Sequence, residues 1–184
     1  MRKKDAMTSP VIETERLILR PPAAEDYEPW LAFLADAEVQ HFLGGVQPRP
    51  AAWRGFCVMA GAWTVFGFAM FSIIEKASGR WVGRLGPWYP EGWPGPEVGW
   101  GLAREAWGKG YATEGAAASI DWAFANLGWT EVIHCIDPKN ANSQNVAKRL
   151  GSRYLREDEM PPPISKRTQI WGQSKAEWFA RKKT

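Results

Sequence analysis

The chain has 184 residues, of which 45% are hydrophobic and 23% are charged. This length predicts one domain, and this composition excludes a disordered, collagen-like or coiled-coil chain. The net charge of +3 is too small to indicate nucleic acid as a partner. The unusual feature is an excess of indole, with twelve Trp against eight Phe and four Tyr.

The two cysteines, Cys57 and Cys135, are too few for a disulfide framework and lack the spacing of a zinc site. We expect two packed thiols, no metal and a cytoplasmic location, because reduced thiols are typical of that compartment. No apolar run follows the basic residues 2–4, so no secretory signal is expected. The sequence predicts a flexible N-terminal tail over residues 1–10 and a single domain over residues 11–184.

The uncharged stretch 55–74 is long enough to cross a membrane. Three Gly interrupt it, and its hydrophobic period changes partway, which favours a helix followed by a buried strand. We therefore expect no membrane as a partner.

Taken in chain order, the first half of the sequence contains one strand, two helices and a hairpin. Turn residues and the spacing of apolar residues place the strand at 17–19, the helices at 26–35 and 48–60, and the hairpin strands at 68–75 and 80–85. Residues 87–96 hold four Pro and two Gly, which predicts a stiff aromatic loop rather than regular structure.

The second half of the sequence alternates strands with helices. The same patterns predict strands over 97–102, 132–136, 153–156 and 169–172, and helices over 113–126, 143–150 and 176–181. Pro161–Pro163 predicts a stiff connector before the last strand.

A strand, a glycine-rich turn and a helix follow one another within residues 97–115. Free backbone N–H groups at a helix N-terminus bind anions, glycines allow close approach, and Lys109 adds a cation there. The turn is neither a dinucleotide fingerprint, because Thr113 replaces the third Gly, nor a Walker A motif, because Gly110 replaces Ser or Thr. Taken alone, it is also compatible with a plain surface turn.

Residues 107–112, Trp-Gly-Lys-Gly-Tyr-Ala, resemble the acyl-CoA-binding motif Gln/Arg-x-x-Gly-x-Gly/Ala of the GNAT N-acetyltransferases. Trp stands in place of the first Gln or Arg, and this variant is similar to the subgroup around the RimJ and RimL ribosomal-protein acetyltransferases. Residues 14–21 resemble the first strand of that subgroup, and residues 140–151 resemble its Asn-x-x-Ser-x-x-Val helix. The matches follow the family's order over residues 14–152.

The resemblance implies a single α/β (α+β) domain with the GNAT fold. Its mixed, mostly antiparallel sheet of six to seven strands is splayed at two central parallel strands and flanked by about four helices. Acetyl-CoA is the implied cosubstrate, and no metal is required. The implied cofactor-binding residues are Leu102, Ala103, Arg104, Trp107, Gly108, Lys109, Gly110, Tyr111, Ala112, Thr113, Asn140 and Asn145.

Acetyl transfer to an amine requires a base, because an amine with a pKa of about 10.4 is protonated at neutral pH. Glu97 is the candidate base, the alternative being an edge carboxylate that fixes the aromatic loop. Many relatives donate the final proton from a Tyr, whose position is Ala147 here. The resemblance to the RimL-like subgroup implies Ser143 for this role, so Ser143 is the candidate acid. The alternative for Ser143 is a helix cap, a role that Asn142 could share. Neither His41 nor His134 is predicted to be catalytic.

Trp88, Trp93 and Trp100 are predicted to form rigid aromatic walls of the acceptor site. These walls favour an apolar or aromatic amine, or a peptide N-terminus, over a polyamine. We expect an N-acetyltransferase, a monomer or homodimer, that acts by direct attack in a ternary complex. The alternative is a non-catalytic acyl-CoA sensor or partner-binding module, and O-acetyl transfer also stays open.

Overall fold

One mixed sheet runs through the computed structural model, which describes residues 10–162 and 164–182. In this part of the chain the sheet has eight strands in the order β1-β2-β3-β4-β5-β6-β8-β7. Their bounds are β1 (Ile12–Glu13), β2 (Leu17–Arg20), β3 (Phe71–Glu75), β4 (Trp81–Trp88), β5 (Glu97–Leu102), β6 (Glu131–Ile136), β7 (Arg153–Glu159) and β8 (Arg167–Ser174). Only β5 and β6 are parallel neighbours, as the resemblance implied.

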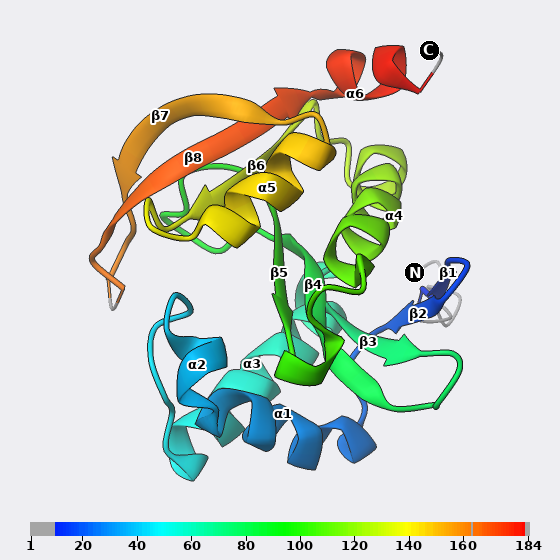
Figure 1. Cartoon of the computed structure of the whole chain (residues 1–184), viewed down its shortest axis with the longest axis vertical. Helices are drawn as coiled ribbons and strands as arrows, with labels where there is room; N and C mark the ends of the chain where they lie inside the picture. Colours follow the sequence, from blue (N-terminus) through cyan, green and yellow to red (C-terminus); the bar gives the residue numbers. More distant parts are fainter. Residues whose placement is uncertain (1–9, 163, 183–184) are drawn as a thin grey trace, which may run out of the picture.

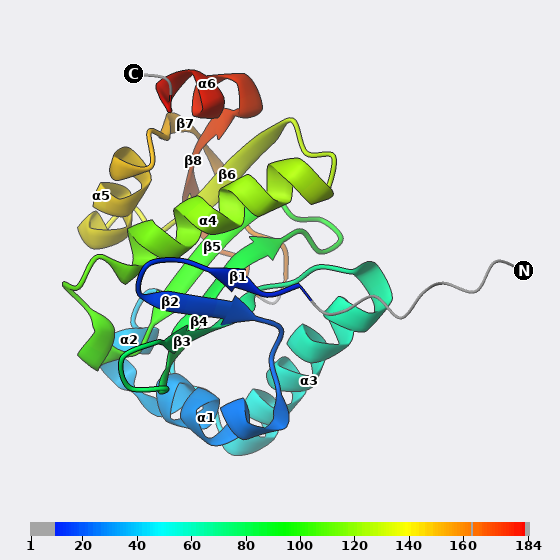
Figure 2. The same cartoon turned by 90° about the vertical axis from the view of Figure 1, so that its right-hand side faces the viewer.

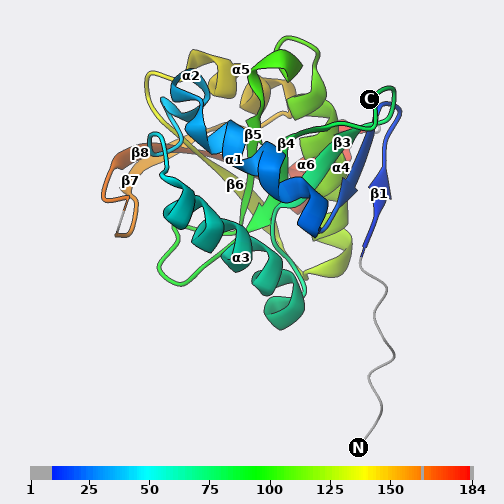
Figure 3. The ribbon, with the colours of Figure 1, turned by 90° about the horizontal axis from the view of Figure 1, so that it is seen from below.

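Six α-helices and two 3₁₀ turns connect the strands within the same residues. The helices are α1 (Tyr27–Ala35), α2 (Ala37–Gln40), α3 (Arg49–Phe66), α4 (Tyr111–Asn126), α5 (Ala141–Arg149) and α6 (Lys175–Arg181), and the turns are Ala24–Asp26 and Arg104–Ala106. Helices α1 to α3 lie together on one face of the sheet, and α4 crosses the other face (Figures 1 and 2). Viewed from below, α1 and α3 run side by side in front of the strands (Figure 3).

The fold class is confirmed, with slightly more elements than expected. The additional elements are β1 and α2, which have two and four residues and are too short for a hydrophobic period to reveal. The predicted tail over 1–10 lies outside the described residues except for Pro10, and so does Pro163 of the connector. Within the described residues no helix combines the length and apolar character needed to span a bilayer.

The prediction that an irregular loop begins at Pro87 is wrong, because β4 continues to Trp88. Pro87 pairs with Val98 on the β5 side, whereas pairing with β3 stops at Leu85, opposite Phe71. Past Leu85, β4 therefore has an unpaired edge on its β3 side. A proline is compatible with such an edge because it lacks only the N–H group.

Helix α3 corrects one expectation about burial. Cys57 was expected to be a packed thiol but is exposed, and Trp53 on the same helix is 56% exposed. They lie four residues apart on one face of the helix, whereas Ala52 and Met59 face the core. Beyond Arg54 this helix has no charged residue, so its sequence does not show which face meets the sheet.

A buried carboxylate joins the start of α1 to strands β2 and β3. Asp26 is only 2% exposed and accepts two bonds from Arg20, at 2.7 and 2.8 Å. It also accepts from Ser72 Oγ at 2.7 Å and from the Ala23 amide at 2.9 Å. The Trp81 indole donates to the same Ser72 hydroxyl at 3.1 Å. This network fixes α1 against the sheet and so positions one wall of the site described below.

We expect Asp26→Ala to lower the free energy of unfolding by about 3–5 kcal/mol, because it leaves the partly buried Arg20 without its counterion. Urea unfolding followed by circular dichroism measures the change. Glu28→Ala is the matched control, since Glu28 also pairs with an arginine but both side chains are exposed, and its expected effect is about 0–1 kcal/mol. Equal effects of the two substitutions would contradict the structural role of Asp26.

Candidate active site

Strands β5 and β6 separate after a single bridge, between Glu97 and Ile133. On its other side β5 pairs with β4 over its whole length. Side chains fill the start of the gap: the His134 ring contacts Val98 O at 2.7 Å and Ser152 Oγ at 2.9 Å, and Trp100 packs 4.9 Å from it. Burial lowers the pKa of His134 to about 4, so this histidine is a neutral core residue.

The backbone of Leu102 faces the gap between the two strands. Ala103 N donates to Val82 O at 2.9 Å, while Leu102 lies opposite Gly83 in the register. In an antiparallel pair, the residue next to such a bonded position turns its N–H and C=O away from the partner strand. The Leu102 N–H is therefore directed toward β6, and its carbonyl accepts from the Trp107 indole at 2.9 Å.

Two further residues expected to bind the cofactor have partners within the protein. The Ala103 amide belongs to the β4 ladder. The Arg104 guanidinium pairs with Asp36 at 2.6 Å and with Glu38 at 3.1 Å. Of the Leu102 and Ala103 amides, only that of Leu102 is directed toward the gap.

The turn that follows β5 has the geometry of an anion site. Gly108 and Gly110 have φ values of +73° and +82°, in the left-handed region that favours glycine. Gly110 is the N-cap of α4, and no described side chain caps the helix there. The amides of the first helical turn, from Tyr111, Ala112 and Thr113, are therefore open to a ligand phosphate.

Lys109, the cation at this turn, also contacts a carboxylate of the protein. Lys109 Nζ lies 3.3 Å from Glu75 Oε1, and Tyr111 Oη donates to the same oxygen at 2.7 Å. Hydrogen bonds from Ser78 and Tyr111, then Lys109, lower the pKa of Glu75 to about 2, so it stays ionised. Because its side chain is buried on Glu75, Tyr111 offers a ligand only its backbone, whereas Lys109 is 41% exposed.

Helix α5 brings Ser143 to the other side of the gap. Asn140 caps this helix, its Oδ1 accepting from the Ser143 amide at 3.0 Å. The cap is therefore neither Ser143 nor Asn142, and the Ser143 hydroxyl instead accepts from Trp100 Nε1 at 3.3 Å. Asn145 is exposed on the same helix.

Glu97 lies at the point where the strands separate and is 6% exposed. Its Oε2 accepts from Trp93 Nε1 at 2.6 Å, and its Oε1 accepts from the Cys135 amide at 2.9 Å. Burial raises the pKa of Glu97, while these hydrogen bonds and the charge of Arg84 oppose the rise. The carboxyl group therefore has a higher affinity for a proton than that of a free glutamate.

The three predicted wall tryptophans do not share one surface. Trp88 lies opposite Glu97 in the register and so shares its face, and Trp93 bonds to Glu97. Trp100 projects from the other face of β5, toward Ser143 and the α5 side. The grouping of Trp100 with the other two is therefore wrong, because neighbouring strand residues alternate between faces.

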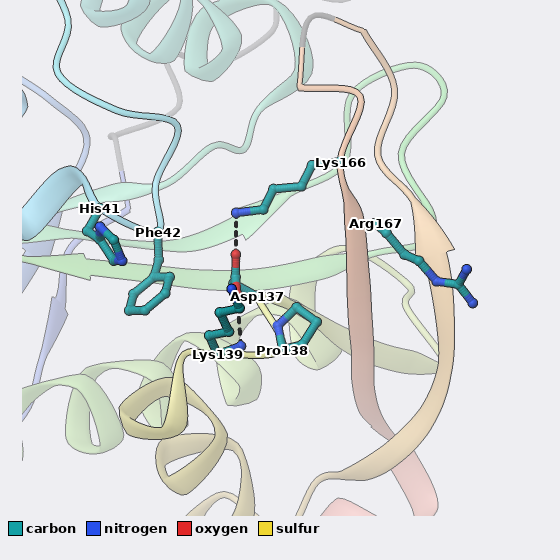
Figure 4. A pocket seen from close by; sticks show the side chains of 7 residues that line it. All are labelled: His41, Phe42, Asp137, Pro138, Lys139, Lys166 and Arg167. Carbon is teal, nitrogen blue, oxygen red and sulfur yellow. Dashed lines mark hydrogen bonds and ion pairs between the residues drawn. The ribbon is translucent and has the colours of Figure 1, made fainter.

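A cleft of about 380 Å³ opens where β6 ends. Its lining residues are His41, Phe42, Asp137, Pro138, Lys139, Lys166 and Arg167. Figure 4 shows Lys166 and Lys139 approaching Asp137 from two sides, whereas Arg167 points away. Trp88, Trp93 and Trp100, which were expected to form the acceptor site, do not line this cleft. Sequence reasoning missed the basic residues because they come from separate loops with no common motif.

Comparison with known proteins decides the family. The sequence model of the acetyltransferase (GNAT) domain matches residues 16–153. The chain belongs to the GNAT acetyltransferase family. Among curated proteins, no sequence match was found.

Solved structures have the same GNAT fold. An acetyltransferase from Agrobacterium tumefaciens is 29% identical, with a TM-score of 0.81 over 95% of this chain and 100% of the other. RimJ from Mycobacterium smegmatis, bound to CoA-disulfide, is 20% identical, with a TM-score of 0.68 over 88% and 83%. The aminoglycoside acetyltransferase AAC(6')-Ib, bound to coenzyme A, is 16% identical, with a TM-score of 0.72 over 91% and 99%.

GNAT acetyltransferases use acetyl-CoA and transfer its acetyl group, so this chain is an acetyl-CoA-dependent acyltransferase. The residues present fit that cosubstrate. The open amides after Gly110 match a pyrophosphate, and the Leu102 amide faces the gap that an extended pantetheine arm would occupy.

We expect Lys109→Met to weaken CoA binding roughly fivefold at low salt, because it removes one exposed cation beside the phosphates. The difference from wild type shrinks as salt is raised, and isothermal titration calorimetry at two ionic strengths measures it. Lys182 is the C-cap of α6 and pairs with Asp121, so Lys182→Met makes the same charge change far from the turn and is the control. Unchanged affinity in Lys109→Met would mean that the backbone amides alone hold the phosphates.

Proposed function

We propose that this protein is an N-acetyltransferase that moves the acetyl group of acetyl-CoA to a primary amine, of a small molecule or a peptide N-terminus, by direct attack in a ternary complex. The observation that carries the proposal is the buried Glu97 carboxylate at the point where β5 leaves β6. It is oriented by the Trp93 indole and the Cys135 amide. A carboxylate with a raised pKa in this place is suited to remove a proton from an amine.

In this mechanism, a residue of this chain assists each chemical step. Bound acetyl-CoA supplies the acetyl group as a thioester. Glu97 takes a proton from the attacking amine through intervening water as the C–N bond forms, because it lies at the opposite end of β5 from Leu102. The Leu102 N–H donates to the carbonyl oxygen as negative charge develops there. Ser143 gives its hydroxyl proton to the sulfur as the C–S bond breaks. Since Ser143 Oγ accepts from Trp100, its own O–H is free to donate.

The finer assignments belong to the same proposal. The motif at residues 107–114 and the fold shared with RimJ support a RimJ/RimL-like protein. The two free cysteines support a cytoplasmic location, and we propose that the protein is a monomer or homodimer.

One observation favours the alternative, a non-catalytic acyl-CoA-binding module. Each oxygen of Glu97 already accepts a hydrogen bond from the protein, as expected of a carboxylate that only fixes the loop 89–96. Thermal stabilisation by CoA without thiol release in the presence of amines would favour this module.

We expect Glu97→Gln to lower kcat/KM about 10²–10⁴-fold while acetyl-CoA binding is retained, because only proton transfer is lost. In wild type, kcat/KM should rise with pH to a plateau, with an inflection above the ordinary glutamate value of about 4.3, and this acidic limb should be absent in Glu97→Gln. Thiol release from acetyl-CoA over a panel of amines and peptides, from pH 5 to 9, measures both.

Glu131→Gln is the control for this experiment, since Glu131 is an exposed carboxylate at the far end of β6. Its pH profile should match that of wild type. Unchanged thiol release in both Glu97→Gln and Ser143→Ala would overturn the mechanism.

Trp93→Phe tests the orientation of Glu97 in another way. The substitution keeps an aromatic ring but removes the N–H donor, whose bond lowers the pKa of Glu97. The pKa of Glu97 therefore rises further, and the acidic limb of the kcat/KM profile moves to higher pH. Trp88→Phe, on the same face without a bond to Glu97, should leave the inflection in place. A shift of equal size in both variants would contradict the role of the indole.

A further inference from the structure

Arg84 occupies the centre of β4, on the face of the sheet that carries Glu97. It lies opposite Gly101 in the register, four positions before Trp88, which lies opposite Glu97. Its guanidinium is packed under α1, 5.5 Å from the Trp30 ring and 5.9 Å from the Phe33 ring. Arg84 is therefore a partly buried cation among aromatic rings, on the face of the sheet that carries Glu97.

The guanidinium has no anionic partner among residues 10–162 and 164–182. Its NH1 donates to the Met70 thioether at 2.6 Å, and its Nε is buried with no acceptor in the same residues. A thioether is a weak acceptor, and burying a guanidinium without a counterion is unfavourable. Burial lowers the pKa of Arg84, and only the charge of Glu97 opposes this. Such a residue indicates an anionic ligand.

Between Arg84 and Glu97, strand β5 carries only glycines on this face, so no β5 side chain covers the backbone there. Gly99 and Gly101 follow Glu97 on this face of β5, and neither has a positive φ that would require glycine. A Cβ at Gly99 would lie 2.8 Å from Met70 Cε. The flexible Met70 side chain thus fills the space between the two charged groups, and its displacement would open that space to a ligand.

The cleft at the end of β6 lies near this space. Phe42 lines the cleft, and its neighbour Leu43 covers Gly101. On the other side, Asp137 lines the cleft two residues after Cys135, whose amide holds Glu97. The lysines of this entrance outnumber its one carboxylate, which gives it a positive potential that attracts anions.

We propose that Arg84 binds a carboxylate of the acceptor, so that the acceptor is an amino acid or another amine with a carboxylate close to its amino group. The proposal rests on the proposed function and narrows it. The acceptor's amine lies at Glu97 and its carboxylate takes the place of the Met70 thioether on Arg84. A planar guanidinium binds a carboxylate through two parallel bonds, which a carboxamide cannot match.

The test compares alanine, leucine and phenylalanine with their carboxamides as acceptors at saturating acetyl-CoA. Wild type should prefer the best free amino acid over its amide by at least about tenfold in kcat/KM. Arg84→Met should bring this ratio to about one. Arg49→Met, an exposed arginine at the start of α3, is the matched control and should keep the wild-type ratio. An equal or higher rate with the amides in wild type would overturn the proposal and leave N-acetyl transfer standing.

Two binding measurements make the test independent of turnover. The N-acetylated products, as acids and as amides, are titrated into the CoA-bound protein, where the acids should bind at least tenfold more tightly to wild type but not to Arg84→Met. If the acids bind wild type no more tightly than the amides, or do not bind at all, the proposal is overturned. If the acids bind tightly but no thiol is released from acetyl-CoA, only the proposed function is overturned. Without ligand, Arg84→Met should melt at the wild-type temperature or above it, because it removes an unpaired buried cation. A lower melting temperature would show a structural cation instead.

Discussion

The site depends on one backbone constraint, the separation of β5 from β6 after their bridge at Glu97 and Ile133. The His134 ring occupies the first carbonyl beyond that bridge, and Trp100 packs on the ring, so side chains rather than backbone bonds join the strands there. The Leu102 amide is consequently left for a ligand. Since β5 leads directly into the turn before α4, the same separation aligns that amide with the anion site at the helix N-terminus. An extended cosubstrate with a charged end fits both.

The cofactor half of the site was predictable from the sequence because it is local. Gly108 and Gly110 signal a left-handed turn within one contiguous motif, and Asn140 begins a helix three residues before Ser143. The acceptor half is set by tertiary structure. Alternation along β5 places Trp100 on the face opposite to Glu97, but the sequence does not show that α5 and Ser143 pack against that face. Nothing near Arg84 in the sequence indicates that its guanidinium is enclosed by α1.

The cations of the cofactor half of the site have carboxylate partners, whereas the cation of the acceptor half has none among the described residues. On the cofactor side, Lys109 pairs with Glu75 and Arg16 pairs with Glu114, so a phosphate competes with carboxylates for these cations. The open amides of α4 have no such competitor, and they are the more dependable part of that anion site. On the acceptor side, Arg84 forms no ion pair within the described residues, and its charge is fully available to a ligand. An anion therefore gains more from a single cation on the acceptor side than on the cofactor side.

The excess of indole acquires a chemical explanation that composition alone could not supply. Trp93 donates to Glu97, Trp100 donates to Ser143, and Trp107 donates to the Leu102 carbonyl. An indole has a donor and no acceptor, so it orients the group it bonds without removing that group's proton. Glu97 keeps lone pairs for a proton from an amine, and Ser143 keeps its hydroxyl proton. A tyrosine or histidine in place of Trp93 or Trp100 could exchange a proton with Glu97 or Ser143, whereas an indole fixes the geometry and leaves proton transfer to these two groups.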